Sequence, residues 1–320
     1  MDNYRKQGKD MRHTDESFAA MLLTLPLTPE GEEAVKPLSG AELGYIAAQL
    51  SLMGDSDLGS LMGRDVSGLM RLLNLTETEA YRVCILLGRD LLLYKLLEDC
   101  MDRGIEVLTP FDKDYPARLK GNLGGIKAPP VFVKGNMELL SANYVGILGI
   151  EGVKTPEAIL TGVNDLVSQA SEYGLGIATE DSLGACRAAR TAAAESGARL
   201  ICALDGGINT LGKKYEPQVE DGSALLISLS HPDAPAGARD VTELVCALSC
   251  AAFIATTDGK RDEAEIIRRR ICDFLYVFDD PALPGNAYAA AKGFERVSKA
   301  DVASNYDKWT GNRGEQLSFL

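Results

Sequence analysis

The sequence lacks both a hydrophobic run long enough to cross a bilayer and the apolar core of a secretory leader. No apolar run approaches the ~18 residues that a membrane-spanning helix needs. Residues 1–16 are polar and charged, whereas a leader has an apolar central region. We therefore expect a protein of the cytoplasm that has no membrane partner.

Metal-binding and redox motifs are also missing. The seven cysteines are scattered without a Cys-x-x-Cys pair, and no histidine lies at ligand spacing near Cys246 and Cys250, which are expected to share a helix face. His231 is the only histidine inside the expected folded region, and no recognisable nucleophile and carboxylate accompany it. The sequence predicts buried reduced thiols. We expect no metal, no other cofactor and no enzymatic activity.

The sequence has fewer positively charged than negatively charged residues. Lysine and arginine number 33 against 46 aspartates and glutamates, which gives a formal net charge of −13. Proteins associate with nucleic acid when lysine and arginine displace counterions from the phosphates. An acidic chain opposes this association, so any nucleic-acid site must be a local basic patch.

Two capping boxes mark the first region with a clear structural pattern. Ser39-x-x-Glu42 and Thr76-x-x-Glu79 each precede apolar residues at helical spacing. Residues 37–104 are thus predicted to form a small all-helical module. The segment 1–36 before it is expected to be partly disordered, with disorder over residues 1–16.

From residue 105 the pattern changes to short apolar strands that alternate with helices. The strands are apolar throughout, as parallel strands covered on both faces must be. This alternation predicts an α/β domain over residues 105–297 with a doubly wound, mainly parallel, Rossmann-like sheet, whose ligands bind at the carboxyl ends of the strands. Residues 298–320 are predicted to form a polar tail. The six main strands are expected at 145–149, 175–179, 199–204, 224–229, 251–256 and 274–278.

Several segments resemble the DNA-processing protein A (DprA/Smf) family, over roughly residues 37–297. The resemblance implies a helical module before an extended Rossmann-like domain. It also implies homodimers that bind single-stranded DNA and deliver it to a RecA-type recombinase, as in recombination and transformation. The segments that carry it are Asp114-Tyr115-Pro116-x-x-Leu119, Pro129-Pro130-Val131-Phe132-Val133-Lys134-Gly135-Asn136, Val145-Gly146-Ile147-Leu148-Gly149 and Ser230-His231-Pro232-Asp233-Ala234-Pro235.

The motifs that carry DNA contacts in this family are altered in this chain. Glu151 stands where the family has the arginine of Gly-Ser-Arg, and Glu243 lies in the segment that aligns with an Arg-Asn-Arg triplet. Glu180 and Asp181 stand where a glycine would expose backbone N–H groups. Because carboxylates repel phosphates, the sequence predicts an eroded DNA site with weak binding. The candidate contacts that the resemblance leaves are Gly149, Thr179, Gly184, Arg187 and Arg239.

Other candidate sites have a competing structural interpretation. The glycines at 146, 149 and 152 form either a phosphate cradle or an inherited tight turn. Lys260 and Arg268 belong to the densest basic cluster, which is either a phosphate-tracking patch or an ordinary salt-bridged helix. The turns at 205–210 and 231–233 are interpreted as structural, since glycine, proline and aspartate favour them.

The last five residues, Gln316-Leu317-Ser318-Phe319-Leu320, resemble the peptide with which bacterial replication proteins bind the sliding clamp. Gln316 would fix the register, and Leu317, Phe319 and Leu320 would supply the apolar anchors. The alternative is that the tail folds back on its own domain. For the whole chain, the leading hypothesis is a non-enzymatic DNA-processing protein. The alternative is a scaffold that has lost DNA binding and serves as a nucleotide-ligand sensor or an interaction module.

Overall fold

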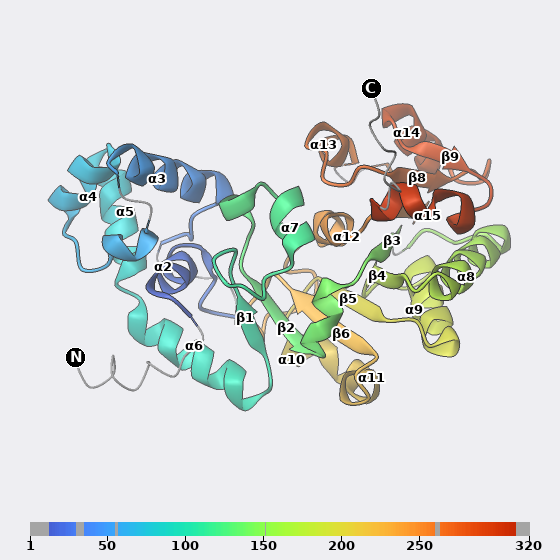
Figure 1. Ribbon diagram of the computed structural model, residues 1–320, viewed down its shortest axis with the longest axis horizontal. Coiled ribbons are helices and arrows are strands. Elements are labelled where there is room, and N and C mark those ends of the chain that lie inside the picture. Colours follow the sequence, from blue (N-terminus) through green and yellow to red (C-terminus); the bar gives the residue numbers. More distant parts are fainter. Residues whose placement is uncertain (1–12, 30–34, 55–56, 151, 260–262, 312–320) are drawn as a thin grey trace, which may run out of the picture.

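The computed structural model describes residues 13–29, 35–54, 57–150, 152–259 and 263–311. They form a helical lobe from the first third of the chain and a larger lobe built on one sheet (Figure 1). The helical lobe consists of α2 (Asp15–Thr24), α3 (Gly40–Leu52), the 3-10 helix η2 (Leu58–Leu61), α4 (Val66–Leu73), α5 (Glu77–Leu87) and α6 (Asp90–Asp102).

Both predicted capping boxes are confirmed. Ser39 and Thr76 accept hydrogen bonds from the third backbone N–H of α3 and α5, and Glu42 and Glu79 bond back to the cap residues. A cap of this kind contributes about 1 kcal/mol to helix stability. The helices then bury a common apolar core that includes Leu50, with no exposed surface.

Helix α2 corrects the expectation that residues 1–16 are disordered. Thr14 caps this helix, with Ser17 N donating to its Oγ1 at 3.1 Å, and Asp15 opens the first turn. The helix is buried on several faces, between the helical core and the sheet lobe. A helix buried in this way lacks the one-sided apolar stripe by which sequence reasoning recognises a helix. Residues 1–12 lie outside the described part of the chain.

The sheet has nine strands in the order β1-β2-β6-β5-β4-β3-β7-β8-β9. In the sheet order, every neighbouring pair from β6 through β5, β4, β3, β7 and β8 to β9 is parallel. Strands β1 and β2 are antiparallel additions at the edge beside β6. The predicted doubly wound, mainly parallel sheet is therefore confirmed, and β9 is a strand that the sequence did not predict. The strands are β1 (Glu106–Leu108), β2 (Val131–Gly135), β3 (Tyr144–Gly149), β4 (Gly176–Glu180), β5 (Leu200–Leu204), β6 (Ala224–Ser228), β7 (Ala251–Thr256), β8 (Leu275–Phe278) and β9 (Glu295–Val297).

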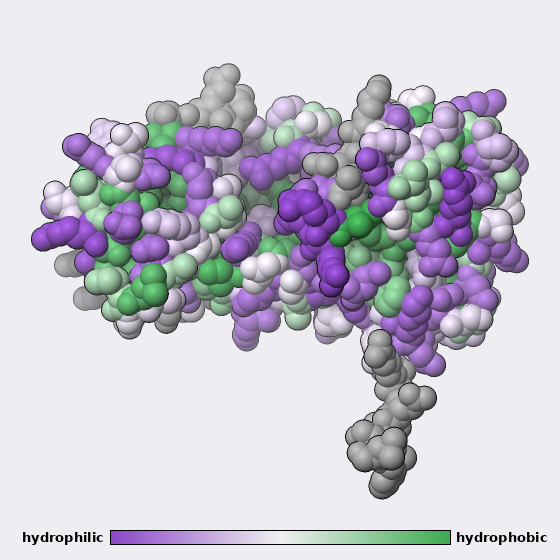
Figure 2. Space-filling view, turned by 90° about the horizontal axis from the view of Figure 1, so that it is seen from above, coloured by the Kyte–Doolittle hydropathy of each residue, from purple (hydrophilic) through white to green (hydrophobic). Residues whose placement is uncertain are grey.

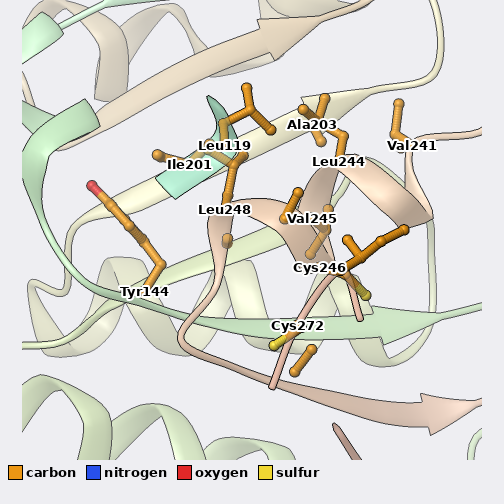
Figure 3. Packing of buried hydrophobic residues seen from close by; sticks show 14 of the residues in the cluster. Leu119, Tyr144, Ile201, Ala203, Val241, Leu244, Val245, Cys246, Leu248 and Cys272 are labelled. Carbon is orange, nitrogen blue, oxygen red and sulfur yellow. The ribbon is translucent and has the colours of Figure 1, made fainter. Parts of the chain in front are cut away.

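Helices cover both faces of the sheet, as right-handed crossovers require. Val145 and Ile147 of β3 face one layer, while Leu148 faces the other. Figure 3 shows the second layer around α12, where Leu244, Val245 and Leu248 pack with residues of the sheet. The first layer contains α8 (Glu157–Glu172), α9 (Ala185–Ser196), α10 (Ile208–Leu211), η5 (Gly212–Tyr215) and α11 (Glu216–Glu220). The second contains α7 (Ala117–Asn122), the 3-10 helix η4 (Met137–Ser141), α12 (Thr242–Leu248), α13 (Glu263–Arg268) and α14 (Pro284–Lys292). The short 3-10 helix η3 (Gly125–Lys127) lies between α7 and β2 in the chain.

The expected position of two cysteines on one helix needs correction. Helix α12 ends at Leu248, so Cys246 and Cys250 do not share a helix face; Cys250 instead lies in the connection to β7. All seven cysteines are free, and six of them are buried. Helix α8 begins at Glu157, directly after Pro156, and no side chain caps it.

The predicted polar tail begins later than expected. Residues 302–310 form helix α15 (Val302–Thr310), whose Trp309 is 3% exposed and packs against Phe253 and Tyr276 of the sheet. Trp309 Nε1 also donates to the Tyr276 hydroxyl at 3.1 Å. Most residues of α15 are polar, and only Val302 and Trp309 are buried in this helix. Two buried positions are too few to give a clear helical pattern in the sequence.

A hydrogen-bonded carboxylate ties the helical lobe to the sheet lobe. Asp112, just after β1, accepts from Ser17 Oγ of α2 at 2.6 Å and from Thr109 N at 2.7 Å. His13 Nδ1 lies 3.3 Å from the same carboxylate, which is 9% exposed. Burial raises the pKa of Asp112, but these hydrogen bonds outweigh burial and hold that pKa below its usual value.

We expect Asp112→Ala to lower the free energy of unfolding by about 3 kcal/mol at neutral pH, because it leaves several buried donors unpaired. A lowered pKa stabilises the fold above the unfolded-state value of about 3.9 and loses that contribution as pH falls through the folded value. In urea denaturation at a series of pH values from neutral to acidic, the difference in the free energy of unfolding between variant and wild type should therefore become smaller as pH falls. Asp114→Ala, at an exposed neighbour, is the control and should change little.

No helix among the described residues is both long enough and apolar enough to span a bilayer. Figure 2 shows one face of the molecule, on which hydrophilic residues spread across the whole surface and hydrophobic residues appear in small separate groups.

Candidate functional site

The loop that follows β4 carries two carboxylates that lie inside the protein. Glu180 is 3% exposed, and its carboxylate accepts from Thr242 Oγ1 at 3.0 Å. The Asp181 carboxylate, 5% exposed, lies 2.7 Å from Lys214 Nζ. The Tyr215 hydroxyl donates to it as well, and burial raises the pKa of Tyr215 so that this phenol stays protonated. Both carboxylates are thus held by partners, and neither presents an open negative charge to the surface.

Arg190 fixes the path of this loop. Its guanidinium donates to the backbone oxygen of Glu180 and, at 2.9 Å, to that of Ser182. The same group lies 3.9 Å from the Asp181 carboxylate, and its side chain is 11% exposed. Arg190 therefore compensates the charge of Asp181 and shapes the loop at the same time.

A groove of about 620 Å³ opens beside this loop, between α9 and the segment η5–α11. The groove begins near the carboxyl end of β4, because Leu183 in the connection from β4 to α9 lines it; on the other side, η5 follows β5 after helix α10. Among the residues that the structure describes, the groove is lined by the cations Arg187, Arg190 and Lys214 and by the carboxylate of Glu195.

The accessibility of these cations differs. Arg187 is exposed, and none of the described residues forms an ion pair or hydrogen bond with its side chain. The Lys214 side chain is 55% exposed although it also bonds Asp181. Arg187 and Lys214 are therefore the groups that can reach a bound anion directly. Tyr215, beneath Lys214 with 5.4 Å between Nζ and the ring centre, is buried and offers no open ring for stacking.

No protein-family model matches the chain, and no curated protein matches its sequence. The solved structures give a clear result. The X-ray structure of DNA processing protein A (DprA) from Streptococcus pneumoniae superposes with a TM-score of 0.61 at 15% sequence identity, over 82% of this chain and 91% of that one. The chain has the DprA fold. The resemblance expected from the sequence is thus confirmed for the fold.

Two other solved structures overlap less. A DprA from Helicobacter pylori, described in terms of its single-stranded DNA binding mode, shares 16% identity over 65% of this chain and 95% of its own, with a TM-score of 0.46. A molybdenum cofactor carrier protein from Chlamydomonas reinhardtii shares 18% identity over 53% of this chain and 99% of its own, with a TM-score of 0.37.

On this DprA fold, three residues predicted from the family motifs have structural roles. The Thr179 hydroxyl is fully buried and donates to Ile147 O at 2.8 Å. A Cβ at Gly149 would lie 3.2 Å from Thr256 Oγ1 and close to the α9 side chains, so glycine allows the strand and the helix to approach. Gly184 precedes α9 with φ of +65°, a conformation that L side chains rarely adopt.

The predicted cations separate into different places. Arg187 lines the groove, whereas Arg239 lies exposed in the loop before α12 and Arg268 pairs with Glu265 on α13. Lys260, Glu151 and the peptide 316–320 lie outside the described residues. The structure thus brings Arg187 together with Arg190 and Lys214, which sequence reasoning missed. The spacing of Arg187 and Arg190 on one helix face was the one signal available for this pair.

The structure shows the surroundings of three carboxylates that the sequence predicted to repel phosphate. Glu180 and Asp181 are buried among partners, and Glu243 forms an ion pair with Arg269 at 2.5 Å. Burial and pairing reduce the field that each projects into solvent.

The two turns interpreted as structural are so in the protein. His231 Nδ1 accepts from the backbone of Asp233 at 3.2 Å, and Ala234 N donates to His231 O at 2.8 Å. Gly207 packs against this loop so closely that a Cβ would lie 2.1 Å from Pro232 O. Among the described residues, no group of three or more His, Cys, Asp or Glu side chains is placed to hold a metal ion.

Proposed function

We propose that the chain is a DNA-processing protein that binds single-stranded DNA along the groove between α9 and α11. The observation that carries this proposal is the position of Arg187 and Lys214 on one open groove, beside Asp181, whose charge Arg190 and Lys214 compensate; Glu195 also lines the groove. The DprA fold agrees with such a role, since proteins of that fold include one described as binding single-stranded DNA. The proposed role is one of binding rather than catalysis, and it agrees with the place of His231 in a turn, where its Nδ1 accepts from the backbone of Asp233.

Binding by this groove is weak in our proposal. Two accessible cations displace few counterions from the DNA, and Asp181 partly compensates the charge of Lys214. In the described part of the chain, no open aromatic ring lines the groove, so a stacking contribution of ~1–3 kcal/mol per base is missing there. The net charge of −13 opposes the approach of the strand.

The test is a fluorescence-anisotropy titration of labelled oligothymidylate across a series of salt concentrations. For two phosphate contacts, the logarithm of the association constant should fall against the logarithm of salt concentration with a slope of about −1.4. Absence of oligothymidylate binding at low salt would contradict the proposal. Tight binding without this salt dependence would place the strand on another surface.

The proposed partners are a second copy of the chain, a RecA-type recombinase and the bacterial sliding clamp. The clamp proposal rests on residues 316–320, which follow α15 and lie outside the described residues. Two buried apolar anchors contribute roughly 1.5–3 kcal/mol each, and ordering the peptide offsets part of this gain. We therefore expect micromolar affinity, near about −8 kcal/mol.

Deleting residues 316–320 should abolish clamp binding in surface plasmon resonance and leave the melting temperature unchanged. Gln316→Ala should weaken binding, whereas Glu315→Ala at the neighbouring position is the matched control. If the deletion lowers the melting temperature, and the intact chain does not bind the clamp, the tail packs on its own domain instead.

A further inference from the structure

The Asp181 carboxylate is held in place by several contacts besides Lys214. Asp181 N donates to Ala203 O at 3.0 Å, which continues the pairing of β4 with β5 beyond the end of the strand. The Tyr215 hydroxyl donates to the carboxylate, and the Arg190 guanidinium lies 3.9 Å from it. The side chains of Asp181 and Arg190 are 5% and 11% exposed, so this part of the cluster is enclosed by the protein. If Lys214 moved away, the carboxylate would therefore keep two partners, one of them charged.

Lys214 is the accessible member of the same cluster. Its side chain is 55% exposed and lines the groove, although its Nζ lies 2.7 Å from Asp181 Oδ1. The ammonium group is carried on a flexible four-carbon stem. It can therefore turn outward into the groove while its backbone on η5 stays where it is.

A phosphate in the groove would compete with Asp181 for this ammonium group. Carboxylate and phosphate oxygens both accept charged hydrogen bonds from lysine. Arg187 differs in this respect, because none of the described residues forms an ion pair or hydrogen bond with its side chain. Of the two accessible cations, only Lys214 has to leave a carboxylate before it binds DNA.

We propose that Lys214 exchanges between Asp181 in the free protein and a phosphate in the DNA complex, so that Asp181 limits the affinity of the groove. After the exchange Asp181 remains bonded to Tyr215 and beside Arg190, and the buried carboxylate is not left without a partner. This proposal rests on the proposed function, because it concerns the same groove.

Asp181→Asn tests the exchange in the oligothymidylate titration. The affinity at low salt should rise by about fivefold, which corresponds to the upper part of the range for an ion pair with one exposed partner. The salt slope should stay at about −1.4, since the number of phosphate contacts does not change. Lys214→Gln should instead reduce the size of the slope by about 0.7, because one contact is lost.

Glu195→Gln is the matched control for the change in charge. Glu195 is exposed and lines the same groove, and among the described residues it pairs with none of the groove's cations. Its substitution should raise the affinity less than Asp181→Asn does, through the field that salt screens. In the Lys214→Gln background, Asp181→Asn should give no larger gain than Glu195→Gln, because the exchanging group is absent.

Tyr215→Phe gives a second test with the opposite sign. The phenol is buried, and its loss leaves the Asp181 carboxylate more dependent on Lys214. DNA affinity should therefore fall by about threefold in the chain that keeps Lys214, and it should not change in the Lys214→Gln background. Thermal melting followed by circular dichroism checks that each variant folds, and Tyr215→Phe decides the matter if Asp181→Asn does not fold.

Unchanged or lower affinity in folded Asp181→Asn would overturn the exchange and make Asp181 a support for Lys214 instead. An equal gain with and without Lys214 would overturn it too, since Asp181 would then act through its field alone. In both cases wild type binds DNA and Arg187→Glu still tests the groove, so only the exchange fails. Absence of binding by wild type and by every variant would contradict the proposed function itself and the exchange with it.

Discussion

Arg187→Glu is expected to reduce single-stranded DNA binding to a level that anisotropy no longer detects at physiological salt. The substitution removes one of two accessible cations of the groove and adds a carboxylate at the same place. At low salt, the affinity should fall by at least about tenfold, and the salt slope should decrease by about 0.7 because one phosphate contact is lost. Since the Arg187 side chain contacts no partner among the described residues, the melting temperature should not change.

The matched control is Arg71→Glu, which changes the net charge equally at an exposed position on α4 of the helical lobe. It should lower affinity only slightly, through the long-range field that salt screens. Arg239→Ala and Arg268→Ala test the two other basic positions predicted from the sequence. If either abolishes binding while Arg187→Glu does not, the strand lies elsewhere and the groove is not its site.

Trp309→Ala is expected to lower the free energy of unfolding by about 3–5 kcal/mol, because it empties a large buried site in α15. The ring meets Phe253 edge-on, with centroids 5.7 Å apart, and its N–H is bonded to Tyr276. Truncation removes both the packing and the hydrogen bond. Guanidinium denaturation followed by circular dichroism measures the change without relying on the tryptophan, of which the chain has one.

Two variants make this result specific. Trp309→Phe keeps most of the ring contact and should lose about 1–2 kcal/mol. Asp307→Ala, at an exposed position of the same helix, should stay within about 0.5 kcal/mol of wild type. Wild-type stability in Trp309→Ala would contradict the packing of α15 on the sheet and would restore the polar tail predicted from the sequence.

Part of the candidate site was predictable from the sequence. Arg187 was identified because it follows a family motif, and the strand ends were expected to carry the ligand site because parallel strands place their carboxyl ends at one edge. Lys214 was not identified, because it becomes part of the groove only when η5 packs beside α9. The chain separates Tyr215 from its partner Asp181 by 34 positions, and no local pattern encodes that pairing.

The alternation of strands and helices and the two capping boxes could be predicted from the amino-acid sequence, because these features depend on residues a few positions apart. The burial and the partners of the charged groups, in contrast, follow from contacts between distant parts of the chain. Glu180 reaches Thr242 across 62 positions, and Asp181 reaches Lys214 and Arg190 from separate elements. A carboxylate repels a phosphate or merely holds a lysine according to its burial and its partners. Burial and partners are set by non-local packing. For this reason the loop after β4, whose sequence suggests that it repels phosphate, can lie beside a groove that is lined by cations.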